Sequence, residues 1–300
     1  MRTFWALSAV ALSPFHVGGT ASVDVSVATL WKAPNLYRTI DRPSVTNPVD
    51  LAQWSSNLAT TADRVWLDSH VQTQALYGQE VTILAVQGGW AKVAVRDEPD
   101  PQDPHGYPGW LPLRQLARAY DTSGRYVVVR HGRTGTLQVG GKTIPLSYGT
   151  RLPLVRWGGD AATVRTPDGV GTVVGVDPPL RATNASIIAE GRRFLGTHYL
   201  WGGLSAWGFD CSGLIWDLYR VHGLTIPRDA DPQMHHGTPV EGAQLRPGDL
   251  LFFGSRNYAD HVSIYLGGGR QLEAPDSAHR VRISPVRWAS YIGARRYLTR

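Results

Sequence analysis

A single cysteine, Cys211, stands in this chain of 300 residues, so no internal disulfide can brace the fold. The chain must therefore be held together by apolar cores. Its composition supplies them, since 42% of the residues are hydrophobic and eleven are tryptophan. The length suggests two or three domains. The 33 glycines and 20 prolines favour a turn-rich architecture with much β structure.

The residues around Cys211 indicate a reactive thiol. Gly202, Gly203 and Gly208 make an irregular approach, and residues 212–222 carry apolar side chains at helical spacing. We therefore expect Cys211 in the first turn of a helix, where unpaired N–H groups and the helix dipole favour the thiolate. The alternative is a buried cysteine that only fills space. The flanking sequence favours the nucleophile.

A thiolate nucleophile needs a base, and His261 is the best placed of the ten histidines. Residues 261–266 alternate between apolar and polar, which predicts a strand with His261 on its polar face. Three glycines then turn the chain into a second strand. If Leu266 pairs with Arg270, Glu273 lies diagonally opposite His261 and can orient the imidazole. Taken singly, the two side chains could equally form an ordinary cross-strand polar pair.

Five motifs follow one another in the C-terminal part of the chain. They are Tyr199-x-Trp-Gly-Gly, Asp210-Cys-Ser-Gly, Ile226-Pro-Arg-Asp, Leu245-Arg-Pro-Gly-Asp-Leu-Leu-Phe-Phe and His261-Val-x-Ile-Tyr-Leu-Gly. With these motifs, residues 182–300 resemble the NlpC/P60 family of papain-like cysteine peptidases. The resemblance implies an α+β catalytic domain.

The resemblance also implies roles for individual residues. Cys211 would be the nucleophile and His261 the base, with Glu273 in a third polar position where many members carry histidine. The Tyr199 hydroxyl and the Cys211 N–H would donate to the oxyanion, although Tyr199 could instead be a packing aromatic. Acyl transfer through a thioester needs no metal or organic cofactor. The neighbouring His235 and His236 lack the further ligands that a zinc site needs.

Short alternating strands upstream of this region predict two SH3-like β-barrels. In the first, a glycine hairpin joins two of the expected strands, and Gly106-Tyr-Pro-Gly-Trp resembles a motif of bacterial SH3-like domains fused to NlpC/P60 peptidases. A short helix is expected over 49–58 and a capped helix over 182–195. The expected strands are 73–77, 80–86 and 90–95 in the first unit and 125–129, 151–155, 162–165 and 171–175 in the second.

The chain thus divides into four predicted segments: a secretory signal over 1–24, a first SH3-like domain with an N-terminal extension over 25–119, a second over 120–180 and the peptidase domain over 181–300. A basic start, an apolar run and small residues suggest the signal. Export would place the protein in the periplasm, at the cell wall or outside the cell. The alternative is the first element of a cytoplasmic enzyme. No apolar stretch is long enough to span a bilayer.

Two SH3-like units ahead of an NlpC/P60 domain resemble the γ-D-glutamyl-diamino-acid peptidases of cell-wall metabolism. The resemblance implies peptidoglycan stem peptides or muropeptides as substrates and a preference for a free N-terminal L-Ala, because the first barrel closes one end of the cleft. Two alternatives to substrate binding remain: Arg228 could form a structural ion pair with Asp229 or another neighbour, and Tyr107 could belong only to the barrel core. The residues expected to bind substrate are Asp210, Ser212, Tyr107, Glu80, Arg228 and Asp229.

The charge pattern bears on the partners. The net charge is +6 and the positive residues are scattered, which disfavours nucleic-acid binding. A mildly positive field suits an anionic polymer such as the cell wall. Two other functions stay open at this point: a wall-binding adaptor with a vestigial site, and a thioester-forming transferase.

Overall fold

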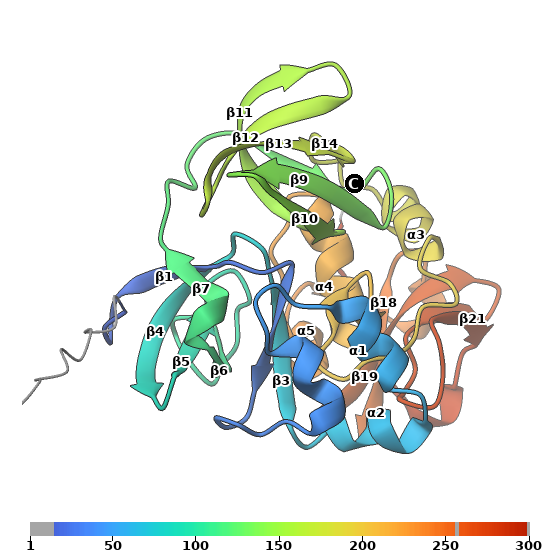
Figure 1. The fold of residues 1–300 in the computed structure, drawn as a ribbon. Helices are drawn as coiled ribbons and strands as arrows, with labels where there is room; N and C mark the ends of the chain where they lie inside the picture. Colours follow the sequence, from blue (N-terminus) through green and yellow to red (C-terminus); the bar gives the residue numbers. More distant parts are fainter. Residues whose placement is uncertain (1–14, 256–257, 299–300) are drawn as a thin grey trace, which may run out of the picture.

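Three packed domains make up the computed structural model, which describes residues 15–255 and 258–298 (Figure 1). Two seven-stranded antiparallel β-sheets form the N-terminal half, and a six-stranded sheet with helices forms the C-terminal domain. The predicted architecture, two SH3-like barrels ahead of an α+β catalytic domain, is confirmed. Within the described residues, no helix has the length and apolarity to cross a membrane.

The first barrel has the strand order β3-β2-β6-β5-β4-β1-β7. Strands β3, β4 and β5 confirm the expected strands, and Gly88 and Gly89 turn β4 into β5 with positive φ, as a two-residue hairpin requires. Val81, Ile83 and Val93 lie in its core. The strands are β1 (Thr20–Val23), β2 (Val27–Trp31), β3 (Val71–Leu76), β4 (Glu80–Gln87), β5 (Trp90–Val95), β6 (Tyr107–Pro112) and β7 (Leu116–Arg118).

Strand β1 corrects the predicted start of this domain. It pairs with β4 and β7, and Ala21 and Val23 are fully buried. The barrel therefore includes residues 20–23, and the expected boundary at residue 25 is wrong. Residues 1–14, which hold the apolar run of the expected signal, lie outside the described residues.

The second barrel repeats the topology of the first. Its order, β10-β9-β13-β12-β11-β8-β14, is the same when the strands are counted from the start of each unit. Strands β9 and β10 were not predicted, because glycines and Pro145 interrupt their patterns. The strands are β8 (Tyr126–Val129), β9 (Thr134–Val139), β10 (Lys142–Ser147), β11 (Arg151–Gly158), β12 (Ala161–Thr166), β13 (Gly169–Val174) and β14 (Val176–Asp177).

Helices inserted between β2 and β3 extend the first barrel toward the catalytic domain (Figure 1). A 3-10 turn, η1 (Thr39–Ser44), precedes α1 (Leu51–Asn57), which confirms the helix expected over 49–58. The second helix, α2 (Thr61–Leu67), was not predicted. Its Arg64 Nε donates to the Ser277 carbonyl at 3.0 Å, so α2 holds a loop of the catalytic domain.

The catalytic domain is built on the sheet β17-β22-β18-β19-β20-β21. Every residue of α4 is buried, because the helix packs against the sheet, α3 and β15 rather than presenting one apolar stripe. Its elements are α3 (Asn184–Arg192), β15 (Leu204–Ser205), β16 (Gly208–Phe209), α4 (Cys211–Val221), α5 (Ala230–Met234), β17 (Thr238–Pro239), η3 (Gly242–Gln244), β18 (Leu250–Ser255), β19 (Tyr258–Gly267), β20 (Arg270–Glu273), β21 (Arg282–Pro285), η4 (Trp288–Ser290) and β22 (Tyr291–Arg296).

Both barrels are hydrogen-bonded to the catalytic domain. The Trp201 indole donates to the Val71 carbonyl in the first barrel at 3.1 Å, and the Tyr148 hydroxyl of the second donates to Glu190 at 2.8 Å. The domain contacts fix the first barrel beside the N-terminal end of α4.

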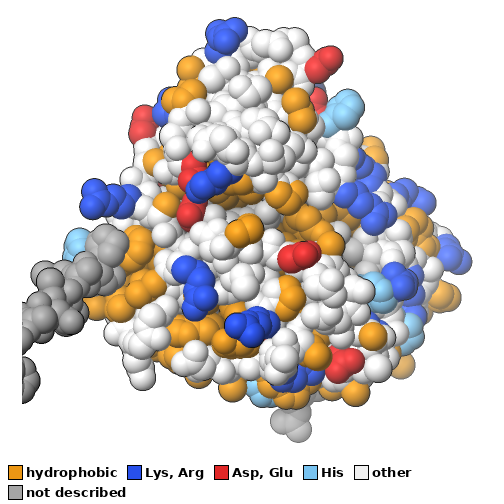
Figure 2. All heavy atoms as spheres, viewed as in Figure 1, with side chains coloured by type: hydrophobic (Ala, Val, Ile, Leu, Met, Phe, Trp, Pro, Cys, Tyr) orange, Lys and Arg blue, Asp and Glu red, His pale blue; other side chains and the backbone are white. Residues whose placement is uncertain are grey.

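On the face seen in Figure 2, basic side chains are spread over the surface and form no single stripe.

Candidate active site

Cys211 is the first residue of α4, as the sequence predicts. The helix is started by Asp210, whose carboxylate accepts a hydrogen bond from the Gly213 N–H at 2.6 Å. The thiol thus lies at the positive end of a fully buried helix. Cys211 is buried but remains 8% exposed and lines a cleft, so solutes can reach it.

His261 and Glu273 meet on neighbouring strands, with 2.9 Å between His261 Nε2 and Glu273 Oε2. Nδ1 is the ring nitrogen left to face Cys211, whose side chain lines the same lobe and contributes to the raised pKa of His261. One detail of the predicted hairpin is wrong: a bulge pairs Arg270 with Gly267 rather than with Leu266. The bulge lies beyond the site, so the register that brings histidine and glutamate together is unchanged.

The charges of His261 and Glu273 stabilise each other. Burial acts to lower the pKa of His261, but hydrogen bonds with Cys211 and Glu273 outweigh it and raise this pKa to about 9. Burial acts to raise the pKa of Glu273, yet its hydrogen bond to His261 and the charges of His261 and Arg287 lower this pKa to about 2. The imidazolium and the carboxylate are therefore both charged at neutral pH.

Sequence reasoning missed the residues that hold Glu273. Arg282 Nε and Ser284 Oγ donate to Oε1 at 3.1 and 2.9 Å, and Arg287 Nη2 lies 3.1 Å from Oε2. The first two come from β21, where Arg282 pairs directly with Glu273. Strand β21 carries no motif, and only its pairing with β20 reveals these contacts.

Replacing Glu273 by glutamine should move the alkaline limb of the pH–rate profile to lower pH. The raised pKa of His261 keeps the imidazolium present below about pH 9, and the imidazolium is lost as the pH rises through that value. Without the carboxylate, this loss should occur at lower pH. The measurement is kcat/KM against pH for both proteins; an unmoved limb would show that Glu273 does not control the base.

The cleft has two lobes that meet at Cys211. The first, of about 370 Å³, is bounded by His261, Asp276 and Arg287, and we call it the histidine lobe. The second, of about 320 Å³, reaches the first barrel, and we call it the barrel lobe. Tyr199 and Cys211 line both lobes. A peptide lying through the cleft would therefore place one side of its scissile bond in each lobe.

Tyr199 lies beside Cys211 in both lobes of the cleft. Its side chain is almost fully buried beside the thiol, and its hydroxyl forms no hydrogen bond with the described residues. Burial, with the nearby Cys211 and Asp210, raises its pKa, so the hydroxyl keeps its proton. It is thus a free donor at the meeting point of the lobes.

Asp210 and Arg228 form a buried ion pair. Arg228 Nη2 donates to Asp210 Oδ2 at 2.8 Å and Nη1 to Oδ1 at 3.0 Å, and the arginine also contacts Ser212 Oγ at 3.0 Å. Arg228 is fully buried. Asp210 lines the barrel lobe, but its charge is neutralised by Arg228 and its oxygens are occupied.

Asp229 and Tyr107 lie together in the wall of the barrel lobe. The Tyr107 hydroxyl reaches across from β6 and donates to Asp229 Oδ2 at 2.8 Å. Burial raises the pKa of Asp229 to about 6, although Arg228 opposes that shift. Ser212 lines the same lobe. Asp229 is therefore an acidic group of this lobe whose charge Arg228, at 3.8 Å, compensates only in part.

The structure corrects the prediction for Glu80. This residue begins β4 and forms an ion pair with Arg96. It lines a separate cavity, together with Arg151 and Arg220, and neither lobe of the cleft includes it. The sequence placed it in the correct barrel, but β4 starts on the side that faces the second barrel rather than Cys211. Among the described residues, no cluster of His, Cys, Asp or Glu is suited to a metal.

Comparisons with known proteins match the whole arrangement. The model of the NlpC/P60 family matches residues 196–296, and that of the bacterial dipeptidyl-peptidase SH3 domain matches 67–116. The chain is 40% identical to the gamma-D-glutamyl-L-lysine dipeptidyl-peptidase of Bacillus cereus, over 93% of this chain and 91% of that protein. It is 35% identical to the protein of the same name in Bacillus subtilis, over 86% and 90% of the two chains.

A solved structure shows the same three-domain arrangement. It is the crystal structure of an NlpC/P60 family protein from Bacillus cereus, with a TM-score of 0.88 and 37% identity over 93% of this chain and all of that one. The match extends across both barrels as well as the catalytic domain. With its cysteine and histidine in one cleft, a buried glutamate hydrogen-bonded to that histidine, and relatives similar over nearly its whole length, this chain belongs to the NlpC/P60 family of cysteine peptidases.

Proposed function

We propose that this protein hydrolyses the γ-D-glutamyl–diamino acid bond of cell-wall stem peptides that carry a free N-terminal L-Ala, with Cys211, His261 and Glu273 as its triad. One observation carries the proposal: Tyr107 of the first barrel donates to Asp229 in the wall of the lobe that Cys211 lines. A carboxylate in this lobe suits a short acyl group with a free amino terminus. The names of the relatives support the bond and the substrate class.

In the proposed reaction, the Cys211 sulfur attacks the γ-carbonyl carbon of D-glutamate. The carbonyl oxygen becomes an oxyanion that accepts hydrogen bonds from the Tyr199 hydroxyl and the Cys211 N–H. When the C–N bond breaks, the His261 imidazolium protonates the leaving amine of the diamino acid. Neutral His261 then takes a proton from water, whose oxygen attacks the thioester, and the γ-carboxylate product leaves as the thiolate re-forms.

Each lobe has a role in this reaction. The L-Ala-γ-D-Glu part would occupy the barrel lobe, with its amine at Asp229, and the diamino acid would occupy the histidine lobe. Asp210 and Arg228 would then fix the start of α4 rather than bind the amine, since they neutralise each other. Ser212 would brace Arg228 and the floor of the lobe.

Blocking the substrate's N-terminus should slow cleavage, and Asp229→Asn should remove that preference. An ammonium–carboxylate hydrogen bond is worth about 1.5–3 kcal/mol, so kcat/KM for L-Ala-γ-D-Glu-L-Lys should fall about 10- to 100-fold in the variant. The rate with the N-acetylated peptide should stay the same. Product masses measure both rates, and Asp160→Asn, an exposed carboxylate in the second barrel, is the control. Equal rates for the two peptides with the unaltered protein would contradict the proposed amine site.

We also infer that the protein acts outside the cytoplasm, on the cell wall or its fragments. The order of basic, apolar and small residues near the start of the chain supports export. N-terminal sequencing of the mature protein tests this inference, and an intact N-terminus in the cytosolic fraction would contradict it.

A further inference from the structure

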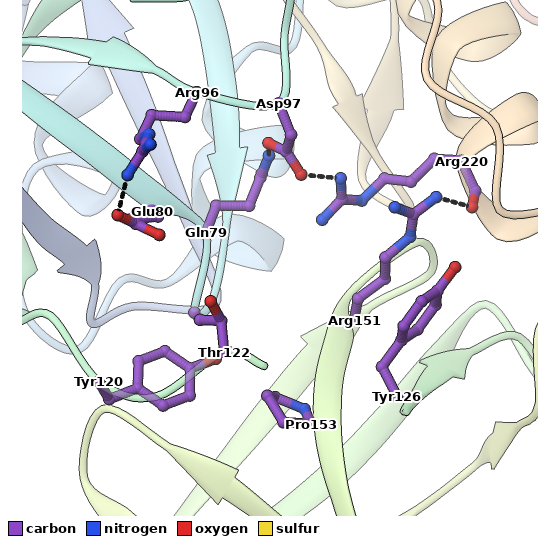
Figure 3. A pocket seen from close by; sticks show the side chains of 11 residues that line it. Gln79, Glu80, Arg96, Asp97, Tyr120, Thr122, Tyr126, Arg151, Pro153 and Arg220 are labelled. Atoms are coloured by element: carbon purple, nitrogen blue, oxygen red, sulfur yellow. Dashed lines mark hydrogen bonds and ion pairs between the residues drawn. The ribbon is translucent and has the colours of Figure 1, made fainter. Parts of the chain in front are cut away.

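A second cavity, of about 290 Å³, lies where the three domains meet (Figure 3). Its wall includes the start of β4 and the end of β5 in the first barrel, the linker around Tyr120, β8 and β11 in the second barrel, and the last turn of α4. Cys211 stands at the other end of α4 and does not line it. The proposed reaction uses no residue of this cavity.

The charges in the cavity wall do not balance. Three arginines face two carboxylates, and each carboxylate already has a partner. Glu80 is paired with Arg96, and Asp97 accepts from both Arg220 and Gln79. Within the part of the chain that the structure describes, no carboxylate lies within ion-pair distance of Arg151. Arg151 thus makes no direct ion pair, and the carboxylates of Asp97 and Asp217 act on it only at longer range.

Arg151 has more donors than its contacts use. Its Nη2 donates to the Arg220 carbonyl at the end of α4, and its guanidinium lies 5.0 Å from the centre of the Tyr126 ring (Figure 3). Its Nε is buried and has no partner. Capping the helix end accounts for one N–H of the five that a guanidinium carries. A buried donor without a partner is costly, which is a reason to expect a ligand here.

The neighbouring side chains add to the imbalance. The Arg220 guanidinium lies close enough to repel Arg151, and burial with this repulsion lowers the pKa of Arg151 to about 10. Tyr120, Tyr126 and Thr122 line the cavity, and their hydroxyls form no hydrogen bond with the described residues. Guanidinium and hydroxyl donors around one cavity suit an anion with several oxygen atoms.

We propose that this cavity binds a small oxyanion, a carboxylate or a phosphate, through Arg151 and the hydroxyls of Tyr120 and Tyr126. The anion would supply a direct counter-charge to Arg151. It would also lie between the two barrels and the end of α4, because the cavity wall comes from all of these parts. The site is distinct from the peptidase cleft, and its occupant need not be the substrate.

Thermal unfolding with added anions tests this proposal. Inorganic phosphate and succinate are titrated separately into the full-length protein, with ionic strength held constant by sodium chloride. We expect a saturable rise in Tm, because a ligand that binds only the folded state stabilises it. A response to phosphate alone identifies the site as one for phosphate, a response to succinate alone as one for carboxylates, and a response to both as one for oxyanions in general.

Variants of single residues locate the anion-binding site. Arg151→Met should weaken the apparent affinity by at least about tenfold, as loss of a charge-assisted hydrogen bond predicts. Arg156→Met, an exposed arginine on the same strand, should leave it unchanged. Tyr120→Phe, which deletes one unbonded hydroxyl, should weaken it less, and it keeps the test decisive if Arg151→Met does not fold.

The response should persist in Cys211→Ala, which separates this site from the catalytic cleft. The proposal is overturned if neither anion gives a saturable rise. It is equally overturned if the variants at Arg151 and Tyr120 respond like Arg156→Met.

Discussion

Replacement of Cys211 by alanine should abolish hydrolysis of L-Ala-γ-D-Glu-L-Lys while the protein remains folded. The sulfur is the nucleophile in the proposed reaction, and neither Tyr199 nor His261 can form the acyl intermediate in its place. Removal of a triad nucleophile typically lowers kcat by about 10⁴-fold or more. Product analysis by mass measures the loss.

Circular dichroism and thermal unfolding provide the control for this variant. Alanine removes only one atom from a side chain that is already partly exposed to the cleft, so we expect a small change in stability. The same peptide with an α-linked glutamate checks the bond specificity. Turnover that persists in a folded Cys211→Ala protein would exclude Cys211 as the nucleophile and leave the adaptor or a different enzyme as the explanation.

Replacement of Arg228 by glutamine should have the largest effect on stability. The arginine is fully buried, neutralises Asp210 and donates to Thr73 Oγ1 in the first barrel at 3.0 Å. Glu98, also buried, lies 3.9 Å away. Removing one partner of a buried ion pair leaves an uncompensated charge and typically costs about 3–5 kcal/mol.

Urea unfolding followed by tryptophan fluorescence measures this cost. Arg118→Gln, which changes an exposed arginine of the first barrel, is the matched control and should change the free energy of unfolding little. The Arg228 variant should also lose activity, because Asp210 starts the helix that carries Cys211. A destabilisation equal to that of the control would show that the buried contacts of Arg228 do not stabilise the fold.

The parts of the site that the sequence predicted are those set by local chain geometry. Cys211 begins a helix because Asp210 caps it, and both residues stand in one short motif. His261 and Glu273 are joined by a tight hairpin, so alternation alone places them on one face of the sheet. A bulge at Gly267 changed the pairing near the turn without moving the site.

The parts that were not predicted depend on contacts between distant segments. Arg228 donates hydrogen bonds to Asp210, 18 residues away, and makes only a longer ion pair of 3.8 Å with its neighbour Asp229, which accepts from Tyr107. Glu80 faces the other side of its barrel, which only the packing of the two barrels decides. Strands β9 and β10 carry glycine and proline, and pairing with their neighbours overrides these weak propensities.

The most direct test of the account is detection of the acyl-enzyme. The protein is mixed with L-Ala-γ-D-Glu-L-Lys, quenched rapidly in acid and analysed by mass spectrometry after digestion. We predict a peptide that contains Cys211 with its mass raised by one L-Ala-γ-D-Glu acyl group, formed as lysine is released. Release of lysine with no acyl group on Cys211, at a rate unchanged by alkylation of the thiol, would contradict the account.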